Sequence, residues 1–212
     1  MNKRILMLGA GGAGMAPLAL YLKGAGCEVT ASDDAFRQPV RSLLLSGDVK
    51  LEDEPQFFDA FDEVVFSSAL KPDHPSLRAA REHGLPTLRR GNALAQAVKG
   101  KKLIAVVGSH GKTTTTAMMV HLLGGFDIPF GYLVGGFFHE RSMPPAQWSD
   151  GEWVVAEIDE SDGTMEDFEP EITLALNCDL DHVDLYGGLK ELRAAFGRLF
   201  QRTKGKVIVP YG

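Results

Sequence analysis

Short apolar runs alternate with helical patterns along the whole sequence, and Gly-Lys-Lys at residues 100–102 separates two series of them. Continuous apolar runs are typical of parallel strands that are covered on both faces. Predicted strands lie at residues 4–8, 27–31, 63–66 and 85–88 in the first series, and at 104–107, 132–134, 153–158, 172–176 and 206–209 in the second. Predicted helices lie at 15–23, 40–46, 75–83, 91–98, 114–123 and 189–201. The pattern predicts an α/β chain with two domains, at residues 1–100 and 101–212.

The strand at 104–107 leads into G-S-H-G-K-T, which has the features of a loop that binds phosphate. Gly108 and Gly111 let backbone N–H groups approach an anion, because a side chain there would block the approach or forbid a positive φ. Lys112 adds a positive charge, Thr113 can bind magnesium, and the following helix directs its positive end at the same phosphates. The candidate nucleotide-binding residues are Gly108, Ser109, His110, Gly111, Lys112, Thr113 and Thr114. The alternative is a glycine turn followed by a solvated lysine.

A second glycine-rich stretch follows the first predicted strand, where residues 9–14 match G-x-G-x-x-G. This motif is typical of the opening of a Rossmann-like, doubly wound parallel sheet, in which a diphosphate lies at a helix N-terminus. Ser32 and Asp33 end the next strand, where a carboxylate commonly binds a ribose hydroxyl. NAD and nucleotide-sugars both carry a diphosphate, so the motif alone leaves both open. Taken alone, Asp33 is better explained as a turn residue at a strand end.

Two positions in the second series suggest metal binding. Glu157 lies in the apolar strand at 153–158, and burying an unpaired carboxylate is costly, so a metal ion or a cationic partner is expected beside it. His182 lies between Asp181 and Asp184 after a buried strand, which makes it a candidate ligand or base. A lone histidine is more often structural. Between these elements, the Gly- and Pro-containing stretch at 135–151 is predicted to be a surface loop.

Composition and charge narrow the class of protein. The net charge of -6 and the absence of a basic tract argue against nucleic acid as a partner. The two cysteines, Cys27 and Cys178, are far apart in sequence and lie beside apolar stretches, which favours free thiols in a reducing cytoplasm. No apolar run reaches transmembrane length, so we expect a soluble cytoplasmic protein without a membrane partner. The sequence does not indicate an oligomeric state.

Six motifs occur in one order along the chain: G-A-G-G-A-G-M at 9–15, S-D at 32–33, S-S-A at 67–69, G-S-H-G-K-T-T-T-T at 108–116, E-I-D-E-S-D-G at 157–163 and D-H-V-D-x-Y at 181–186. Together they resemble the Mur ligases, the ATP-dependent amide-forming enzymes of peptidoglycan synthesis, over essentially the whole chain. The resemblance implies a Rossmann-like domain at 1–100 that binds a UDP-sugar. It also implies an incomplete P-loop domain at 101–212 that binds ATP.

Individual residues take roles from the same resemblance. The implied UDP-sugar-binding residues are Gly11, Gly12, Ala13, Gly14, Ser32, Asp33 and Ser68. In the second domain, Lys112 would hold the β- and γ-phosphates. Thr113 and Glu157 would bind one magnesium ion, and His182 a second one. The implied catalytic residues are therefore Lys112, Glu157 and His182, and the implied cofactors are ATP and Mg²⁺.

Within the family, the chain is most similar to the branch that joins L-alanine to UDP-N-acetylmuramate. In that reaction, ATP phosphorylates the lactyl carboxylate and the amine then attacks the acyl phosphate. Several other branches carry a carbamylated lysine on the helix after D-H-x-D, where this chain has Phe196. The alternatives are a ligase that recycles murein peptides, an NAD-dependent oxidoreductase and a non-catalytic nucleotide-binding module. The family's third domain is missing from the sequence, so we expect the 212-residue chain alone not to ligate.

Overall fold

The computed structural model describes residues 3–138, 143–161, 163–179 and 186–210. The chain divides into two compact units, which are described separately below. Unit 1 comprises residues 1–94 and 136–149, and unit 2 comprises residues 95–135 and 150–212. The domain boundary at residue 100 stays a prediction.

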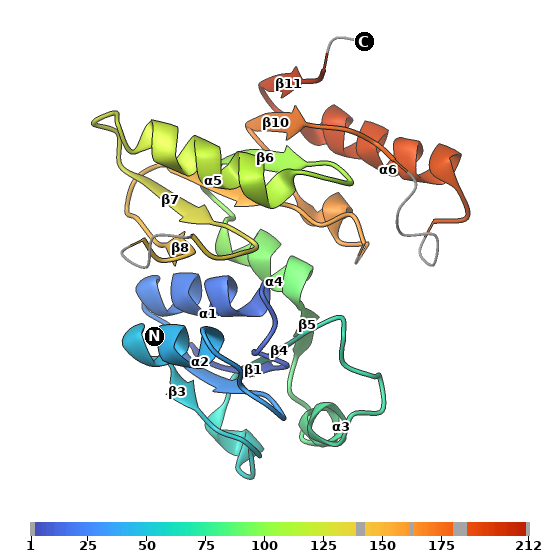
Figure 1. The fold of residues 1–212 in the computed structure, drawn as a ribbon. Helices are drawn as coiled ribbons and strands as arrows, with labels where there is room; N and C mark the ends of the chain where they lie inside the picture. Colours follow the sequence, from blue (N-terminus) through green and yellow to red (C-terminus); the bar gives the residue numbers. More distant parts are fainter. Residues whose placement is uncertain (1–2, 139–142, 162, 180–185, 211–212) are drawn as a thin grey trace. The chain divides into compact units, whose positions relative to one another are not determined.

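Unit 1 is built on a sheet of parallel strands in the order β3-β2-β1-β4-β5 (Figure 1). Its strands are β1 (Arg4–Leu8), β2 (Glu28–Ser32), β3 (Lys50–Leu51), β4 (Glu63–Phe66) and β5 (Thr87–Arg89). Its helices are α1 (Met15–Gly24), α2 (Val40–Ser46), η1 (Phe58–Ala60) and α3 (Pro75–Glu82), and α4 (Arg90–Ala97) runs across the boundary between the units. The chain moves from the central β1 first to one edge and then to the other, which is the predicted doubly wound topology.

Helices cover both faces of this sheet. Leu6 of β1 packs in one cluster with Val64 of β4 and Leu77 of α3, and all three are fully buried. Met7 points to the opposite face, because side chains alternate along a strand, and it is also fully buried. Figure 1 shows α1 on the side of the sheet opposite to α3. A strand buried on both faces reads as a continuous apolar run, which explains why the sequence pattern predicts it.

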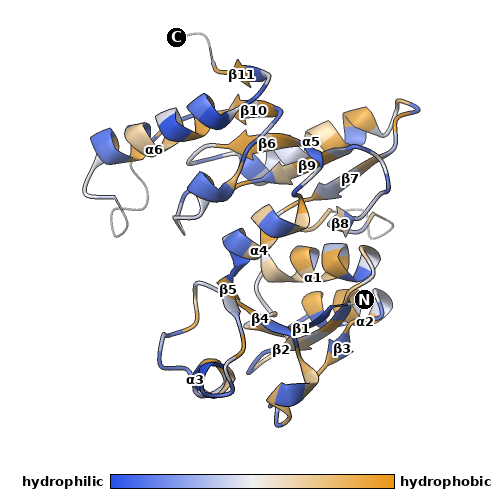
Figure 2. Cartoon of the chain, turned by 180° about the vertical axis from the view of Figure 1, so that it is seen from behind, coloured by the Kyte–Doolittle hydropathy of each residue, from blue (hydrophilic) through white to orange (hydrophobic). Residues whose placement is uncertain are grey.

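Unit 2 contains a second parallel sheet, with strands in the order β11-β10-β6-β9-β7. These strands are β6 (Lys102–Val107), β7 (Phe130–Leu133), β9 (Trp153–Glu157), β10 (Ile172–Ala175) and β11 (Lys206–Ile208). Its helices are α5 (Lys112–Leu123), η2 (Met165–Asp167) and α6 (Leu189–Arg202). Figure 2 shows the alternation of polar and apolar residues along α6, whose buried residues are Leu192, Ala195, Phe196 and Leu199. The spacing of three and four residues explains the predicted amphipathic helix.

The structure contains every predicted strand and helix, with small shifts at their ends, and adds two short strands. These are β3 and β8 (Ala146–Gln147), each of two residues, too short for a periodic pattern. β8 lies in the stretch predicted as a surface loop. Residues 136–149 of this stretch belong to unit 1, where a Cβ on Gly24 of α1 would lie 2.9 Å from the Cβ of Trp148. Both cysteines are free thiols, and none of the described helices is long and apolar enough to span a membrane.

Two buried threonines of unit 2 give a matched test of the packing. The Thr116 hydroxyl on α5 is fully buried and has no hydrogen-bond partner among the described residues. The Thr173 hydroxyl on β10 is equally buried but lies 2.7 Å from the Thr203 hydroxyl. Thr116→Val removes an unsatisfied polar group and should raise the free energy of unfolding by about 1 kcal/mol, whereas Thr173→Val should lower it by a similar amount. Denaturant unfolding measures both, and equal signs would contradict this account.

Candidate functional site

The carboxyl ends of β1, β2 and β4 meet at the first glycine loop. The amides of Gly9 and Ala10 donate to the Ser32 carbonyl at 2.9 and 3.0 Å. Gly9 has a φ of +73°, and a Cβ there would lie 2.9 Å from the Cβ of Ser67. The loop therefore needs glycine at this position, because it turns in a left-handed conformation against the neighbouring strand end.

Asp33 holds the glycine loop in place. Its carboxylate accepts hydrogen bonds from the amides of Gly11 at 2.8 Å and Ala35 at 3.0 Å. A Cβ on Gly11 would lie 2.8 Å from the same carboxylate. The carboxylate of Asp33 can therefore come this close to the loop only because residue 11 is glycine. Ser32 is 5% exposed, and its hydroxyl donates to the Asp53 carbonyl at 3.1 Å. The structure thus brings Ser32 and Asp33 to the loop as supports of its shape.

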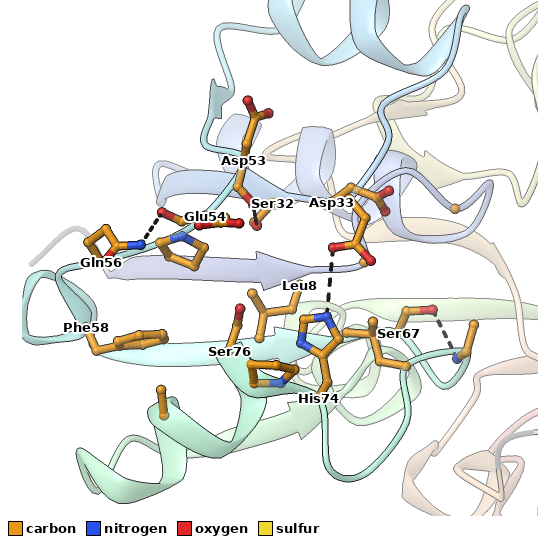
Figure 3. A pocket seen from close by; sticks show the side chains of 18 of the residues that line it. Leu8, Ser32, Asp33, Asp53, Glu54, Gln56, Phe58, Ser67, His74 and Ser76 are labelled. Atoms are coloured by element: carbon orange, nitrogen blue, oxygen red, sulfur yellow. Dashed lines mark hydrogen bonds and ion pairs between the residues drawn. The ribbon is translucent and has the colours of Figure 1, made fainter.

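A cavity of about 630 Å³ opens at this edge of the sheet of unit 1 (Figure 3). It is lined by Leu8, Gly9, Gly12, Ser32, Asp33, Asp34, Asp53, Glu54, Pro55, Gln56, Phe58, Ser67, Ala69, Leu70, His74, Pro75, Ser76, Ala79 and His83. Gly12, Ser32 and Asp33 of the predicted residues lie on this lining, whereas Gly11, Ala13, Gly14 and Ser68 do not. The described lining contains four carboxylates and no lysine or arginine, so it suits hydroxyl and N–H donors better than a diphosphate.

His74 and Arg90 add groups that the sequence analysis did not single out. His74 lies on the cavity wall, with its Nε2 3.9 Å from the Asp34 carboxylate. Its Nδ1 is buried without a hydrogen-bond partner in the described part of the chain. A Cβ on Gly14 would lie 3.2 Å from the Cδ and 3.3 Å from the Nε of Arg90. Arg90 therefore brings a positive charge to the N-terminus of α1, where a diphosphate is expected.

The second glycine loop connects β6 to α5. Gly108 has a φ of +145°, and a Cβ there would lie 3.1 Å from the Cβ of Leu176 and 3.2 Å from the backbone nitrogen of Asn177. Gly111 has a φ of +83° and is the residue before the first helical position, Lys112. Both glycines are therefore required by the turn itself, as the motif predicts.

Two side chains fasten this loop to the segment after β10. The amide of His110 donates to the Asn177 side-chain oxygen at 2.8 Å, and the Asn177 side-chain amide donates back to the His110 carbonyl at 3.0 Å. The Ser109 hydroxyl donates to the Asp179 carbonyl at 2.7 Å and accepts from the Asp179 amide at 3.0 Å. Ser109 and His110 thus shape the loop.

Cys178 lies between Asn177 and Asp179 in the sequence. Burial raises the pKa of its thiol, which keeps the thiol neutral.

Lys112 lies at the mouth of the loop and is already paired. Its ammonium donates to the Gly108 carbonyl at 2.6 Å and to the Glu160 carboxylate at 2.7 Å. The Lys112 side chain is 15% exposed and that of Glu160 is 1% exposed. Lys112 lies on the predicted strand–loop–helix turn, whereas no pattern in the sequence indicates its partner Glu160.

Glu157 ends β9, beside the strand that leads into the loop, since Glu157 is paired with Val106 of β6. Its side chain is half-buried, and a Cβ on Gly135 would overlap its Oε1 atom. Gly135 therefore provides the space that the carboxylate occupies. Thr113, in the first turn of α5, is half-buried as well. The Glu157 carboxylate and the Thr113 hydroxyl are hard oxygen donors. Mg²⁺ prefers ligands of this kind.

His182 and its acidic neighbours lie outside the described residues, so its predicted role stays a prediction. Among the residues that are described, no three or more His, Cys, Asp or Glu side chains gather into a group that could hold a metal ion. Phe196 is 3% exposed, and its ring centroid lies 6.2 Å from that of Phe200. That position is part of the apolar core between α6 and its sheet.

Comparison with known proteins identifies the family. Residues 4–102 match the model of the Mur ligase family, catalytic domain, and residues 106–211 match that of the Mur ligase middle domain. The chain belongs to the Mur ligase family. This membership decides against an NAD-dependent oxidoreductase, which the first glycine motif had left open.

Relatives and solved structures agree with the assignment. The chain is 36% identical to UDP-N-acetylmuramate–L-alanine ligase of Bifidobacterium longum, over 95% of the chain and 40% of that protein. The enzyme of the same name from Persephonella marina is 38% identical, over 92% of the chain and 42% of that protein. The crystal structure of UDP-N-acetylmuramate-alanine ligase MurC from Thermotoga maritima has a TM-score of 0.86 at 27% identity, over 98% of the chain and 49% of that structure.

The fold is shared more widely than the sequence. The crystal structure of UDP-N-acetylmuramate:L-alanyl-γ-D-glutamyl-meso-diaminopimelate ligase from Neisseria meningitides has a TM-score of 0.88 at 24% identity, over 99% of this chain and 71% of that structure. This likeness concerns the fold alone. The chain spans about 40% of the length of the curated relatives named above.

The space at Gly135 gives a test of the Glu157 geometry. Gly135→Ala should lower the free energy of unfolding by roughly 1–3 kcal/mol, because the new methyl group displaces the carboxylate. Combining it with Glu157→Ala should recover most of that loss. Gly197→Ala on α6, where a Cβ meets nothing within 4 Å, is the control and should not destabilise the chain. Denaturant unfolding of these three variants measures this, and a double variant no more stable than Gly135→Ala would contradict the overlap.

Proposed function

We propose that this chain is the part of a Mur ligase that binds UDP-N-acetylmuramate and ATP, in an enzyme that joins L-alanine to the lactyl carboxylate of the sugar. The presence of two glycine loops in one chain, each leading from a central parallel strand into a helix, carries this proposal. A ligase that activates a nucleotide-linked acid with ATP needs two such sites. The names of the relatives at 36–38% identity support the choice of substrates. Two uncharged, free cysteine thiols and nucleotide substrates support a cytoplasmic location.

In unit 1, the distribution of charge suggests that two parts of the nucleotide-sugar bind at two different sites. The acidic cavity accepts hydrogen bonds from ribose hydroxyls and from the base, and the buried Nδ1 of His74 offers one further polar contact. The diphosphate binds at the N-terminus of α1, where backbone amides and the Arg90 side chain offset its charge. Because the diphosphate binds away from the acidic cavity, the glycine loop can bind it although four carboxylates line that cavity.

In unit 2, the loop amides and Lys112 bind the β- and γ-phosphates of ATP. Thr113 and Glu157 would hold a magnesium ion, which supplies charge neutralisation between the phosphates and the incoming carboxylate. Without this neutralisation, the negative oxygens of the γ-phosphate and the lactyl carboxylate repel each other and prevent in-line approach. The absence of a side chain at Gly135 leaves the space that the Glu157 carboxylate occupies.

The proposed reaction has two steps. An oxygen of the lactyl carboxylate attacks the γ-phosphorus, the bond to the β-phosphate oxygen breaks, and ADP leaves. The amine of L-alanine then attacks the carbonyl carbon of the acyl phosphate, loses a proton and expels inorganic phosphate. The contribution of this chain is to position two anionic groups and to balance their charge, because phosphoryl transfer depends mainly on positioning and electrostatics.

We expect calorimetry to show that the chain binds UDP-N-acetylmuramate and does not bind NAD. Arg90→Ala should weaken the UDP-sugar about tenfold, because the diphosphate loses a cation, whereas Arg89→Ala, at the exposed neighbouring position, should leave the affinity unchanged. NAD binding without a response to the UDP-sugar would defeat the assignment of unit 1.

The full-length protein should release phosphate when UDP-N-acetylmuramate, ATP and L-alanine are all present. Lys112→Ala should lower the rate about a hundredfold or more, because the loop loses the charge that stabilises the transferring phosphoryl group. Lys190→Ala, an exposed lysine at the start of α6, is the matched control. A full-length protein that accepts a murein tripeptide but not L-alanine would be a recycling ligase, and one that binds both nucleotides without any turnover would be a non-catalytic module.

A further inference from the structure

Lys112, the cation of the candidate phosphate loop, is paired with the carboxylate of Glu160. The ammonium that should meet the nucleotide instead contacts a carboxylate at 2.7 Å and a carbonyl of its own loop at 2.6 Å. Glu160 is 1% exposed, so its negative charge is screened very little by water. In the nucleotide-free chain, the positive charge of the loop is therefore largely cancelled.

The same carboxylate is incompletely satisfied. Glu160 Oε1 is buried and has no hydrogen-bond partner in the part of the chain that the structure describes. Buried ion pairs often contribute no more stability than apolar side chains of similar size, particularly when some of their lone pairs stay unpaired. Stability alone is thus a weak reason for an ionised Glu160, and its position against Lys112 indicates a role in ligand binding.

The charges predict what this role is. A nucleotide phosphate must compete with Glu160 for the Lys112 ammonium. Once the phosphate is bound to Lys112, its negative oxygens lie close to the buried carboxylate of Glu160. A nucleotide without a divalent cation carries more negative charge than its metal complex, so the carboxylate disfavours it more.

We propose that Glu160 makes the loop selective for metal-bound nucleotides, because it holds Lys112 in the empty site and opposes the charge of a metal-free phosphate chain. The proposal rests on the proposed function of unit 2. It makes Glu160 a positioning residue that acts through Lys112, separate from Glu157 at the end of β9 and its suggested role at the metal.

The test compares ADP binding to the chain in EDTA and in excess magnesium. Glu160→Gln keeps the shape of the side chain and removes its charge. It should tighten metal-free ADP about tenfold and change the affinity for the magnesium complex by less than about threefold. Glu166→Gln is the matched control, because Glu166 is half-exposed, pairs with Arg198 and lies on η2 in the same unit. It removes one charge from unit 2 and should leave both affinities unchanged.

The outcomes separate this inference from the function on which it rests. If Glu160→Gln lowers the affinity for ADP equally in EDTA and in magnesium, Glu160 only holds Lys112 in position. The proposed selectivity for metal-bound nucleotides is then wrong. If the unmodified chain binds no nucleotide with or without magnesium, the proposed function of unit 2 fails and the inference fails with it.

A crystal structure of the unmodified chain with magnesium and ADP gives a second measurement that does not depend on how the variant folds. The Lys112 ammonium should then lie on the phosphates, more than about 4 Å from Glu160, beyond the limit for an ion pair. A contact that stays at its present 2.7 Å with the nucleotide bound would overturn the proposal.

Discussion

The turn from β6 into α5 is the constraint on which the candidate ATP site depends. The chain has to leave the sheet and begin a helix across Gly108 and Gly111, both with positive φ, while the end of β10 lies against it. Only a backbone without side chains fits at Gly108, because the backbone of Asn177 is within contact distance. The reciprocal hydrogen bonds between Asn177 and His110 then fix the loop. Lys112, as the first residue of α5, takes its place from this turn.

Both candidate phosphate loops lie in a chain that has more acidic than basic residues. The net charge of -6 gives no general attraction for phosphate, so binding depends on local groups. In unit 1, the N-terminus of α1 and Arg90 form a positive place next to an acidic cavity. In unit 2, Lys112 lies at the N-terminus of α5, but Glu160 pairs with it and Glu157 ends the neighbouring strand. Carboxylates therefore lie near both candidate phosphate loops.

Local patterns in the sequence predicted the strands, the helices and both glycine loops, because each is encoded by residues close together in the chain. Glu160, Gly135 and Arg90 could not be found in this way. Glu160 meets Lys112 across 48 residues of sequence, and only the pairing of β6 with β9 brings them together. Gly135 matters because of a carboxylate on another strand, and nothing in its own neighbourhood signals that. The sequence analysis noted Phe196 only for its place in the family motif, whereas its burial on α6 follows from packing.

The two glutamates at the end of β9 show how burial separates chemically identical groups. Glu157 is half-buried beside the loop, in a space kept open by Gly135, so its charge can be shared with a ligand. Glu160, three residues later, is fully enclosed, so its charge acts on the ammonium it touches. Removing one partner of a buried pair leaves an uncompensated charge, which costs more than the pair itself contributes. If a phosphate draws Lys112 away from Glu160, the negative charge of Glu160 must therefore be compensated by another group.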